Sequence, residues 1–199
     1  SGENKNGEVV VVAETDLTDI TGIRLEVLTD PSLPGNGPGR ANDGNFVVAE
    51  IEVSAAPKGA PDQSKRVVLK NALADFSQAE FDVAKAIDGN LDDQRGWAVS
   101  PRTGILHWAT FETEAPVGGS GGTALTIKLH HRFSDAWTLG RFRLSATRRP
   151  NPGLSLAEDL RAVLATAPEV RTPAQNALLL SYHQGMDPEL AAKRAALGA

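Results

Sequence analysis

The sequence predicts an all-β protein, a two-sheet β-sandwich, followed by a short α-helical appendage at the C-terminal end. Nineteen glycines and twelve prolines divide much of the chain into short apolar segments, which is typical of many strands joined by turns. Several of these segments alternate apolar and polar residues with the two-residue period of a strand. After residue 150 the spacing becomes helical. We therefore expect a sandwich domain over residues 1–150 and a helical tail over residues 151–199.

About eight strands are expected in the first domain. Residues 9–13 form a continuous apolar run, and residues 23–27 alternate apolar with charged side chains, so these two segments are expected to pair as neighbouring strands. In residues 46–53 the odd-numbered positions are apolar and fall on one face. The remaining strands are expected at residues 66–72, 108–113, 125–129 and 141–147.

The segments between the strands are rich in turn residues. Residues 30–45 are so dense in Gly, Pro and Asn that no regular element fits, and a loop of that length in a compact domain is often functional. Residues 55–64, 75–81 and 118–122 are read as further turns. Capping patterns predict three helices in the tail, from Ser155 to about residue 165, from Thr172 to about residue 183, and from Asp187 onward.

Composition excludes several classes of function. Because the chain has no cysteine, it cannot form a disulfide, a thiolate metal site or a covalent c-type haem attachment. The net charge of −5 argues against a nucleic-acid partner, since binding phosphates needs a basic face. No apolar run approaches the roughly 20 residues that span a bilayer, so we expect no membrane insertion by this fragment. The start at Ser1-Gly2 without Met suggests a domain excised from a longer protein.

The most informative stretch is residues 84–112, an acidic turn followed by a strand that carries Trp108. Asp88, Asn90, Asp92 and Asp93 surround a glycine, and this concentration of oxygen donors favours a hard cation such as Ca²⁺. The same residues are also compatible with an ordinary turn whose acids are solvated. From the residues alone, both interpretations remain open.

The segment Ala86-Ile87-Asp88-Gly89 to Trp97 resembles the calcium-binding segment of galactose-binding-like (discoidin-like) modules. This resemblance implies a jelly-roll sandwich that holds one structural calcium. The segment Ala49-Glu50-Ile51-Glu52-Val53 resembles the final strand of those modules, but it lies near the start of this chain, which implies a permuted strand order. The ligands that the resemblance implies are Ala49, Glu50, Lys85, Asp88, Asn90 and Asp93.

A longer series of motifs carries a second, more specific resemblance. The motifs are Thr15-Asp16-Leu17, residues 21–26, 34–41, 45–47, 75–78, 86–89, 96–98 and 138–145, and Arg171-Thr172-Pro173-Ala174-Gln175. Together they are similar to the linker domain of large planctomycete-specific surface proteins that join cytochrome c-like domains to a conserved C-terminal domain. The middle domain of those proteins resembles a carbohydrate-binding module. This implies an extracellular or cell-surface location, with a periplasmic one as the alternative, and other domains of the parent protein as partners.

Sugar recognition needs an aromatic ring against the apolar face of a pyranose, with charged and amide side chains bonding the hydroxyls. Trp97 is expected in the core, because the resemblance places a buried Trp after the acidic turn. Trp108 and Trp137 are the candidate stacking residues, and the sequence leaves open whether they are exposed or buried. The candidate ligand-binding residues are Trp108, Trp137, His107, Arg102, Arg95 and Arg40.

No catalytic motif is found. The patterns G-x-S-x-G and H-E-x-x-H and the Gly-Lys phosphate loop are absent, and neighbouring carboxylates such as Glu50 and Glu52 can satisfy a glycosidase spacing by accident. His130 and His131 are expected on opposite faces of a strand, as a solvated pair rather than a metal site. We therefore predict a non-catalytic, calcium-stabilised carbohydrate-binding module of a larger surface or secreted protein. The alternative is a structural spacer or docking module between neighbouring domains, without a sugar site.

Overall fold

The computed structural model describes residues 5–149, 160, 163–164 and 166–186. The chain divides into two compact units, Ser1–Gly153 and Leu154–Ala199, and each is described by itself. The sequence analysis placed this boundary after residue 150. None of the helices within the described ranges has the length and apolar character needed to cross a membrane.

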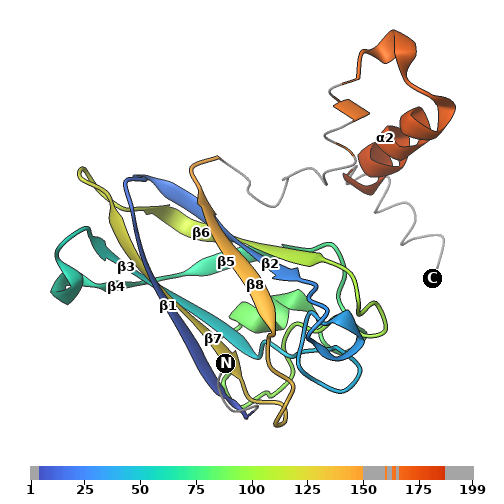
Figure 1. Ribbon diagram of the computed structural model, residues 1–199. Coiled ribbons are helices and arrows are strands. Elements are labelled where there is room, and N and C mark those ends of the chain that lie inside the picture. Colours follow the sequence, from blue (N-terminus) through green and yellow to red (C-terminus); the bar gives the residue numbers. More distant parts are fainter. Residues whose placement is uncertain (1–4, 150–159, 161–162, 165, 187–199) are drawn as a thin grey trace, which may run out of the picture. The chain divides into compact units, whose positions relative to one another are not determined.

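The first unit is a β-sandwich of two four-stranded antiparallel sheets (Figure 1). One sheet has the order β1-β7-β3-β4 and the other has the order β5-β6-β2-β8. The strands of the first sheet are β1 Gly7–Thr15, β7 Thr123–His131, β3 Glu50–Pro57 and β4 Lys65–Val67. Those of the second are β5 Leu69–Ala74, β6 His107–Val117, β2 Ile20–Leu28 and β8 Arg141–Thr147. The predicted all-β, two-sheet architecture is confirmed.

One predicted pairing and one predicted strand are wrong. β1 and β2 were expected to be neighbours, but β1 pairs with β7, whereas β2 lies between β6 and β8 in the other sheet. The segment predicted as one strand over residues 66–72 is two strands, β4 and β5, one in each sheet. The physical reason is that a two-residue period specifies which face of a strand is buried, but not which strand lies beside it.

The third predicted strand is displaced along the chain. It was expected over residues 46–53, but β3 covers residues 50–57. Residues 46–49 are buried on all sides, and Val48 forms an isolated bridge with Trp97, with N–H···O distances of 3.0 and 2.9 Å. At the other end, the buried Ala55 and Ala56 continue the strand into the predicted turn region.

The core lies between the two sheets. The inward face of β2 presents Ile23, Leu25 and Val27, as the alternation predicted, and these pack with the inward faces of β3, β6 and β7. Trp97 is fully buried, in an edge-to-face contact with Phe46 at 5.1 Å between ring centroids. Burying an aromatic side chain of this size stabilises the fold by several kcal/mol, at about 25 cal/mol per Å². The prediction that Trp97 is a core residue is confirmed.

Short 3-10 helices lie in the connections. They are η1 Pro34–Asn36, η2 Pro61–Gln63 and η3 Val83–Ile87. The predicted long loop over residues 30–45 contains η1 and one isolated bridge, between Gly39 and Leu139. Of these helices, η3 positions residues 88–96, which we call the acidic segment, because η3 ends directly before Asp88.

In the second unit, η5 Pro168–Val170 precedes α2 Pro173–Met186. The backbone N–H of Thr172 donates to Gln175 Oε1 at 2.8 Å, and the backbone N–H of Gln175 donates to Thr172 Oγ1 at 3.3 Å. This is the reciprocal capping box that the sequence predicted, so the second predicted helix is confirmed. The first and third predicted helices fall mainly or wholly outside the described residues.

Candidate functional site

The acidic segment and the start of β3 meet in space. Asp82 caps η3 by accepting a hydrogen bond from the Ala84 N–H at 2.8 Å, and η3 then delivers Asp88 and Gly89 to β3. The Gly89 N–H donates to Glu50 Oε2 at 3.2 Å, although the two residues are 39 positions apart. Gly89 has a φ of 77°, a left-handed conformation that favours glycine. The two parts of the implied metal site are therefore in contact.

The far end of the acidic segment is held against the same stretch of chain. Gly96 precedes Trp97, which makes the bridge with Val48. A Cβ atom at Gly96 would collide with the Val48 carbonyl oxygen, so this close approach requires glycine. Both ends of the acidic segment are thus fixed to residues 48–50.

Glu50 is a buried carboxylate with little compensating charge. It is only 2% exposed, and no basic side chain of the described residues lies within ion-pair distance of it. Burial raises the pKa of Glu50 to about 7, and the charges of Asp88 and Glu52 act in the same direction, against the Gly89 hydrogen bond and the charge of Arg66. Because an unpaired buried charge is costly, a cation beside Glu50 would relieve this cost.

Other side-chain oxygen atoms of the acidic segment accept hydrogen bonds from backbone N–H groups within the same segment. Asp88 Oδ1 accepts from the Asn90 N–H at 2.8 Å, and Asn90 Oδ1 accepts from the N–H groups of Asp92 and Asp93 at 3.1 and 3.2 Å. Each oxygen retains a further lone pair. Ala49, the implied carbonyl ligand, is fully buried next to Glu50, and its N–H donates to the His130 carbonyl at 2.8 Å.

Asp93 is turned toward basic side chains. Its Oδ1 accepts from the backbone N–H and the Nε of Arg95, at 3.0 and 3.2 Å, and its Oδ2 lies 3.6 Å from Lys85 Nζ. These hydrogen bonds from Arg95, with the charges of Arg95 and Lys85, lower the pKa of Asp93. Arg95, a candidate sugar contact, also lies 3.6 Å from Glu80. Within the described part of the chain, no three His, Cys, Asp or Glu side chains converge as a metal site would require.

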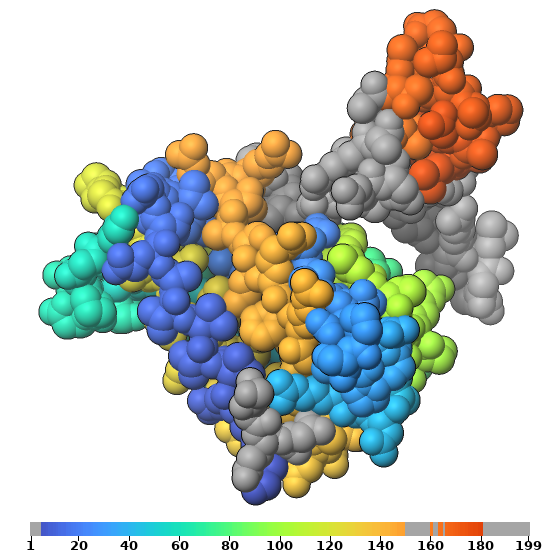
Figure 2. All heavy atoms as spheres, viewed as in Figure 1, coloured from blue at the N-terminus to red at the C-terminus, as the bar shows by residue number. Residues whose placement is uncertain are grey.

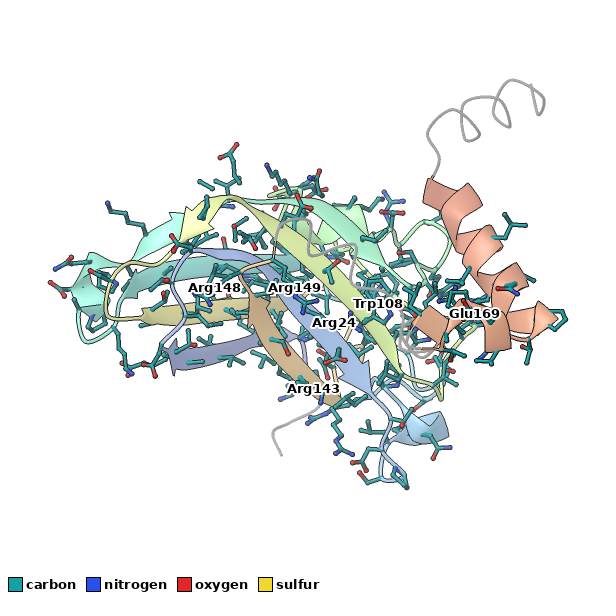
Figure 3. All side chains as sticks on the ribbon, turned by 90° about the horizontal axis from the view of Figure 1, so that it is seen from above. Arg24, Trp108, Arg143, Arg148, Arg149 and Glu169 are labelled. Carbon is teal, nitrogen blue, oxygen red and sulfur yellow. The ribbon has the colours of Figure 1, made fainter. Side chains whose placement is uncertain are left out.

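Trp108 lies on the outer face of the second sheet, opposite Glu26 in the β2–β6 register. Figure 3 shows it beside Arg24, whose guanidinium lies 4.6 Å from the indole centroid. Glu26 binds both Arg24, at 3.6 Å, and Arg143, at 2.6 Å. The hydrogen bond from Arg143 is the main cause that lowers the pKa of Glu26. The indole is therefore part of a network of charged side chains on the sheet.

His107 is buried and fully engaged within the protein. Its Nδ1 lies 2.8 Å from Asp75 Oδ2 and its Nε2 lies 2.6 Å from the Arg102 carbonyl oxygen. Desolvation lowers the pKa of His107, but the hydrogen bonds to these two acceptors outweigh it and raise the pKa. The Arg102 side chain stacks on Phe76 at 4.5 Å. The structure thus places His107 inside the protein, as a support for the start of β6.

Trp137 belongs to a row of aromatic rings in the loops, which we call the aromatic row: Phe81, Phe133 and Trp137. Phe133 lies 5.3 Å from Trp137 and 5.3 Å from Phe81, both in edge-to-face geometry. All three rings are partly exposed. The Arg40 N–H donates to the carbonyl of Thr138 at 2.9 Å, so the long loop runs alongside Trp137. The sequence analysis missed Phe81 and Phe133, although each is an isolated Phe in a polar connection.

An open polar hollow of about 430 Å³ is formed partly by residues next to the aromatic row in the chain. Arg132, which lines it, precedes Phe133, and Asn6, which also lines it, donates its backbone N–H to Asp135 Oδ1 at 3.0 Å. The hollow receives side chains from the start of β1, the end of β7 and the acidic segment. It is lined by Asn6, Gly7, Glu8, Leu91, Asp92, Gln94, His131 and Arg132.

The adjacent histidines are buried, so the expectation of a solvated pair is wrong. His130 lies between two carboxylates: its Nε2 is 3.1 Å from Glu52 Oε2, and its Nδ1 is 3.2 Å from Glu8 Oε1 but outside hydrogen-bond geometry. His131 Nδ1 lies 2.8 Å from the Val47 carbonyl oxygen. Desolvation lowers the pKa of His131, which favours the neutral ring. Their contacts come from residues distant in the sequence, Glu8 and Glu52 for His130 and Val47 for His131, so the sequence alone does not reveal the burial.

A larger hollow of about 490 Å³ lies elsewhere on the sandwich, between residues 55–68 and 114–119. Unlike the polar hollow, its lining contains no residue of the acidic segment. Comparisons of the chain with protein-family models, with curated proteins and with solved structures found no match. The polar hollow, which the acidic segment lines and whose Arg132 precedes Phe133 of the aromatic row, is therefore the candidate site.

Proposed function

We propose that the first unit is a calcium-stabilised carbohydrate-binding module of the jelly-roll, galactose-binding-like type. The observation that carries this proposal is the contact between the buried Glu50 carboxylate and Gly89 of the acidic turn. It brings together the two chain segments that a shared calcium would join. In this proposal the module is non-catalytic and belongs to a larger secreted or surface protein. By binding a glycan, it keeps that protein close to the glycan.

In the proposed metal site, Glu50 and Asp88 supply carboxylates, Asn90 supplies an amide oxygen, and Ala49 and Lys85 supply carbonyls. A mixed set of oxygen donors in a flexible segment suits Ca²⁺ better than Mg²⁺, which demands stricter octahedral geometry. Asp93 would become a further calcium ligand only if its contacts with Arg95 and Lys85 break. The ion would neutralise Glu50 and fix the acidic segment.

The proposed sugar site is the polar hollow with the aromatic row. A pyranose ring stacks on Trp137 or Phe133, and Asp92, Gln94 and Arg132 bond its hydroxyls. Asp92 and Gln94 belong to the segment that the calcium would fix. Calcium binding and glycan binding are therefore expected to be coupled.

A thermal melt tests the metal site. With calcium added to metal-free protein, we expect the melting temperature to rise by several degrees, as for a ligand at about 100 times its dissociation constant. Glu50→Gln should abolish this rise, whereas the exposed Glu114→Gln should retain it. An unchanged melting temperature for the wild type would count against the calcium site.

The alternative function is a spacer or docking module without a sugar site. The exposed Val10 and Val12 on β1 favour it, at 51% and 68% exposure, because exposed apolar side chains on a strand can mark a protein contact. A panel of polysaccharides discriminates the two: if calcium-loaded wild-type protein binds none of them, the spacer function takes over.

A further inference from the structure

His107, the first residue of β6, has an oxygen acceptor at each of its ring nitrogens. Its Nδ1 lies 2.8 Å from Asp75 Oδ2, and its Nε2 lies 2.6 Å from the Arg102 carbonyl oxygen. A carbonyl oxygen and an ionised carboxylate only accept hydrogen bonds, and a neutral imidazole has a single N–H to donate. Both contacts are hydrogen bonds only if the ring carries a hydrogen on each nitrogen. The geometry therefore indicates that His107 is an imidazolium in the folded protein.

This charged ring is enclosed by the protein. The His107 side chain is 1% exposed, and the Phe76 ring lies 6.0 Å away between centroids. The charged side chains that act on the ring are Asp75, after β5, and Arg102, before β6, whereas on β2 the register places the apolar Val27 opposite it. Burial and the charge of Arg102 disfavour the imidazolium. The hydrogen bonds to Asp75 and to the Arg102 carbonyl, with the charge of Asp75, outweigh both and raise the pKa of His107 from its ordinary value of 6.5.

One of these hydrogen bonds fastens the loop that leads into β6, which we call the 99–106 loop. This loop is also tied to the long loop. The Gly104 N–H donates to the Gly37 carbonyl at 2.6 Å, and the Val99 N–H donates to Asn45 Oδ1 at 3.0 Å. In Figure 2 the light-blue atoms of the long loop lie against the lime-green atoms near residue 100. The imidazolium thus holds a loop that contacts a second loop.

We propose that His107 is a pH-dependent switch, which as an imidazolium holds the 99–106 loop against the start of β6 and which releases that loop when it loses a proton. The proton that leaves is the one on Nε2, because the Asp75 carboxylate is the stronger acceptor and keeps the hydrogen on Nδ1. The Nε2 lone pair then faces the Arg102 carbonyl oxygen, and the contact changes from attraction to repulsion. The inference does not depend on glycan or calcium binding.

The direction of the pH dependence follows from the raised pKa of His107. The stabilising contribution of the ring is fully present below the ordinary pKa of 6.5, and it is lost as the pH rises through the raised value. The pKa of Glu50 is about 7, so this carboxyl titrates in an overlapping range. The test must therefore observe the His107 ring and the 99–106 loop, and not overall stability alone.

Nuclear magnetic resonance of the full chain tests the protonation state, since only four histidines contribute ring signals. A proton–nitrogen correlation spectrum of the rings distinguishes the imidazolium from the two neutral forms. At about pH 6 both ring nitrogens of His107 should carry a hydrogen, and after the alkaline transition only Nδ1 should carry one.

Hydrogen exchange of the Gly104 N–H reports on the 99–106 loop, because this group donates to Gly37 across the two loops. Its protection, relative to an unstructured peptide at the same pH, should fall by about tenfold or more between about pH 6 and about pH 9, as for the loss of a hydrogen bond to a charged group. The Glu114 N–H is the reference within β6. It donates to the Val68 carbonyl at 2.9 Å and should keep its protection.

Asp75→Asn separates the switch from a general loss of stability. The new amide Oδ1 can still accept from the Trp108 N–H, and its Nδ2 can donate to Nδ1 of a neutral His107 ring, which leaves the Nε2–H for the Arg102 carbonyl. The 99–106 loop of this variant should therefore stay protected at about pH 9, with a neutral ring. Glu112→Gln is the matched control, because it removes one negative charge from β6 itself. It should show the pH dependence of the wild type.

Three results would overturn the proposal. The first is a wild-type His107 ring with a single hydrogen at about pH 6. The second is a Gly104 protection that stays constant up to about pH 9 in the wild type. The third is an Asp75→Asn variant whose 99–106 loop opens with rising pH as it does in the wild type.

Discussion

Trp108 and Trp137 are both partly exposed, but their surroundings differ. Trp108 lies on a sheet face beside Arg24, within a network that Glu26 joins to Arg143. Trp137 lies in a loop, in contact with Phe133, and the preceding Arg132 lines a polar hollow. The difference teaches that exposure alone does not make an aromatic ring a binding surface, because neighbouring groups can already occupy the ring.

The energetic contrast follows from these neighbours. A sugar that stacks on the Arg24 side of Trp108 must displace a cation–π contact, which is worth about 0.5–1 kcal/mol at an exposed site. It must also disturb the bonds that Glu26 makes. At Trp137 the neighbouring rings meet edge to face, and the polar hollow lined by Arg132 has polar side chains for hydroxyl groups. The proposed loop site would therefore combine the stacking and the hydrogen bonding that sugar recognition needs.

The largest expected effect is on glycan affinity. Trp137→Ala should weaken binding by about 3 kcal/mol, on the order of 100-fold, as for a central aromatic contact. Trp108→Ala should change the affinity by less than about twofold, since it lies outside the site. Isothermal titration with the polysaccharide that binds the wild type measures both. The reverse ranking would move the sugar site to the sheet face.

The second effect is on stability at the Trp108 side. Asp75 Oδ1 accepts a hydrogen bond from the backbone N–H of Trp108 at 2.8 Å, and Asp75 Oδ2 lies 2.8 Å from His107 Nδ1. Asp75→Ala should therefore lower the free energy of unfolding by about 2–3 kcal/mol, because a buried histidine loses its partner. Urea denaturation measures the loss. Glycan affinity of the folded variant should be unchanged, and a large loss of affinity would contradict the separation of the two regions.

The third effect is a pH dependence at Glu50. Burial raises its pKa from 4.5 to about 7, so the neutral form is favoured in the folded state. In metal-free protein its stabilising contribution is fully present below the unfolded pKa and is lost as the pH rises through about 7. The free energy of unfolding should therefore fall by about 3 kcal/mol between pH 4.5 and pH 8 from this group alone.

Calcium should reverse this trend, because binding displaces the Glu50 proton. The calcium-induced rise in melting temperature should be larger at pH 8 than at pH 5.5. Glu50→Gln should remove both the pH-dependent loss and the calcium response, which melts at the two pH values measure. An equal calcium response at both pH values would argue against Glu50 as a ligand.

The smallest effect concerns the network over Trp108. Arg24→Ala removes the cation–π contact and one ion pair of Glu26, so we expect a loss of about 1 kcal/mol in the free energy of unfolding. The newly uncovered indole should still bind no glycan, because Trp108 is not among the residues that line the polar hollow. Affinity electrophoresis checks this, and new binding that depends on Trp108 would show that Arg24 alone keeps sugar away.

The sequence predicted much of the fold because local patterns determine it. Alternation placed Ile23, Leu25 and Val27 in the core, and the Thr172–Gln175 capping box marked the start of α2. It did not predict that β1 and β2 belong to different sheets, or that residues 66–72 cross from one sheet to the other. Those features depend on which strands meet in three dimensions, which the period of one segment does not encode.

The site was predictable to a similar extent. The resemblance placed the acidic turn beside Glu50, and the two are in contact. The burial of His107 was not foreseen, because its partners Asp75 and Arg102 come from other segments. Phe81 and Phe133 were missed because loop residues far apart in the chain become a row only after folding.

One measurement tests the central claim most directly: affinity electrophoresis of the full chain against a polysaccharide panel, in calcium and in chelator. The account predicts that at least one polysaccharide retards the wild type in calcium, and that chelation or Trp137→Ala removes the retardation while Trp108→Ala keeps it. The account is contradicted if no polysaccharide retards the protein in calcium, or if retardation persists in chelator and in Trp137→Ala.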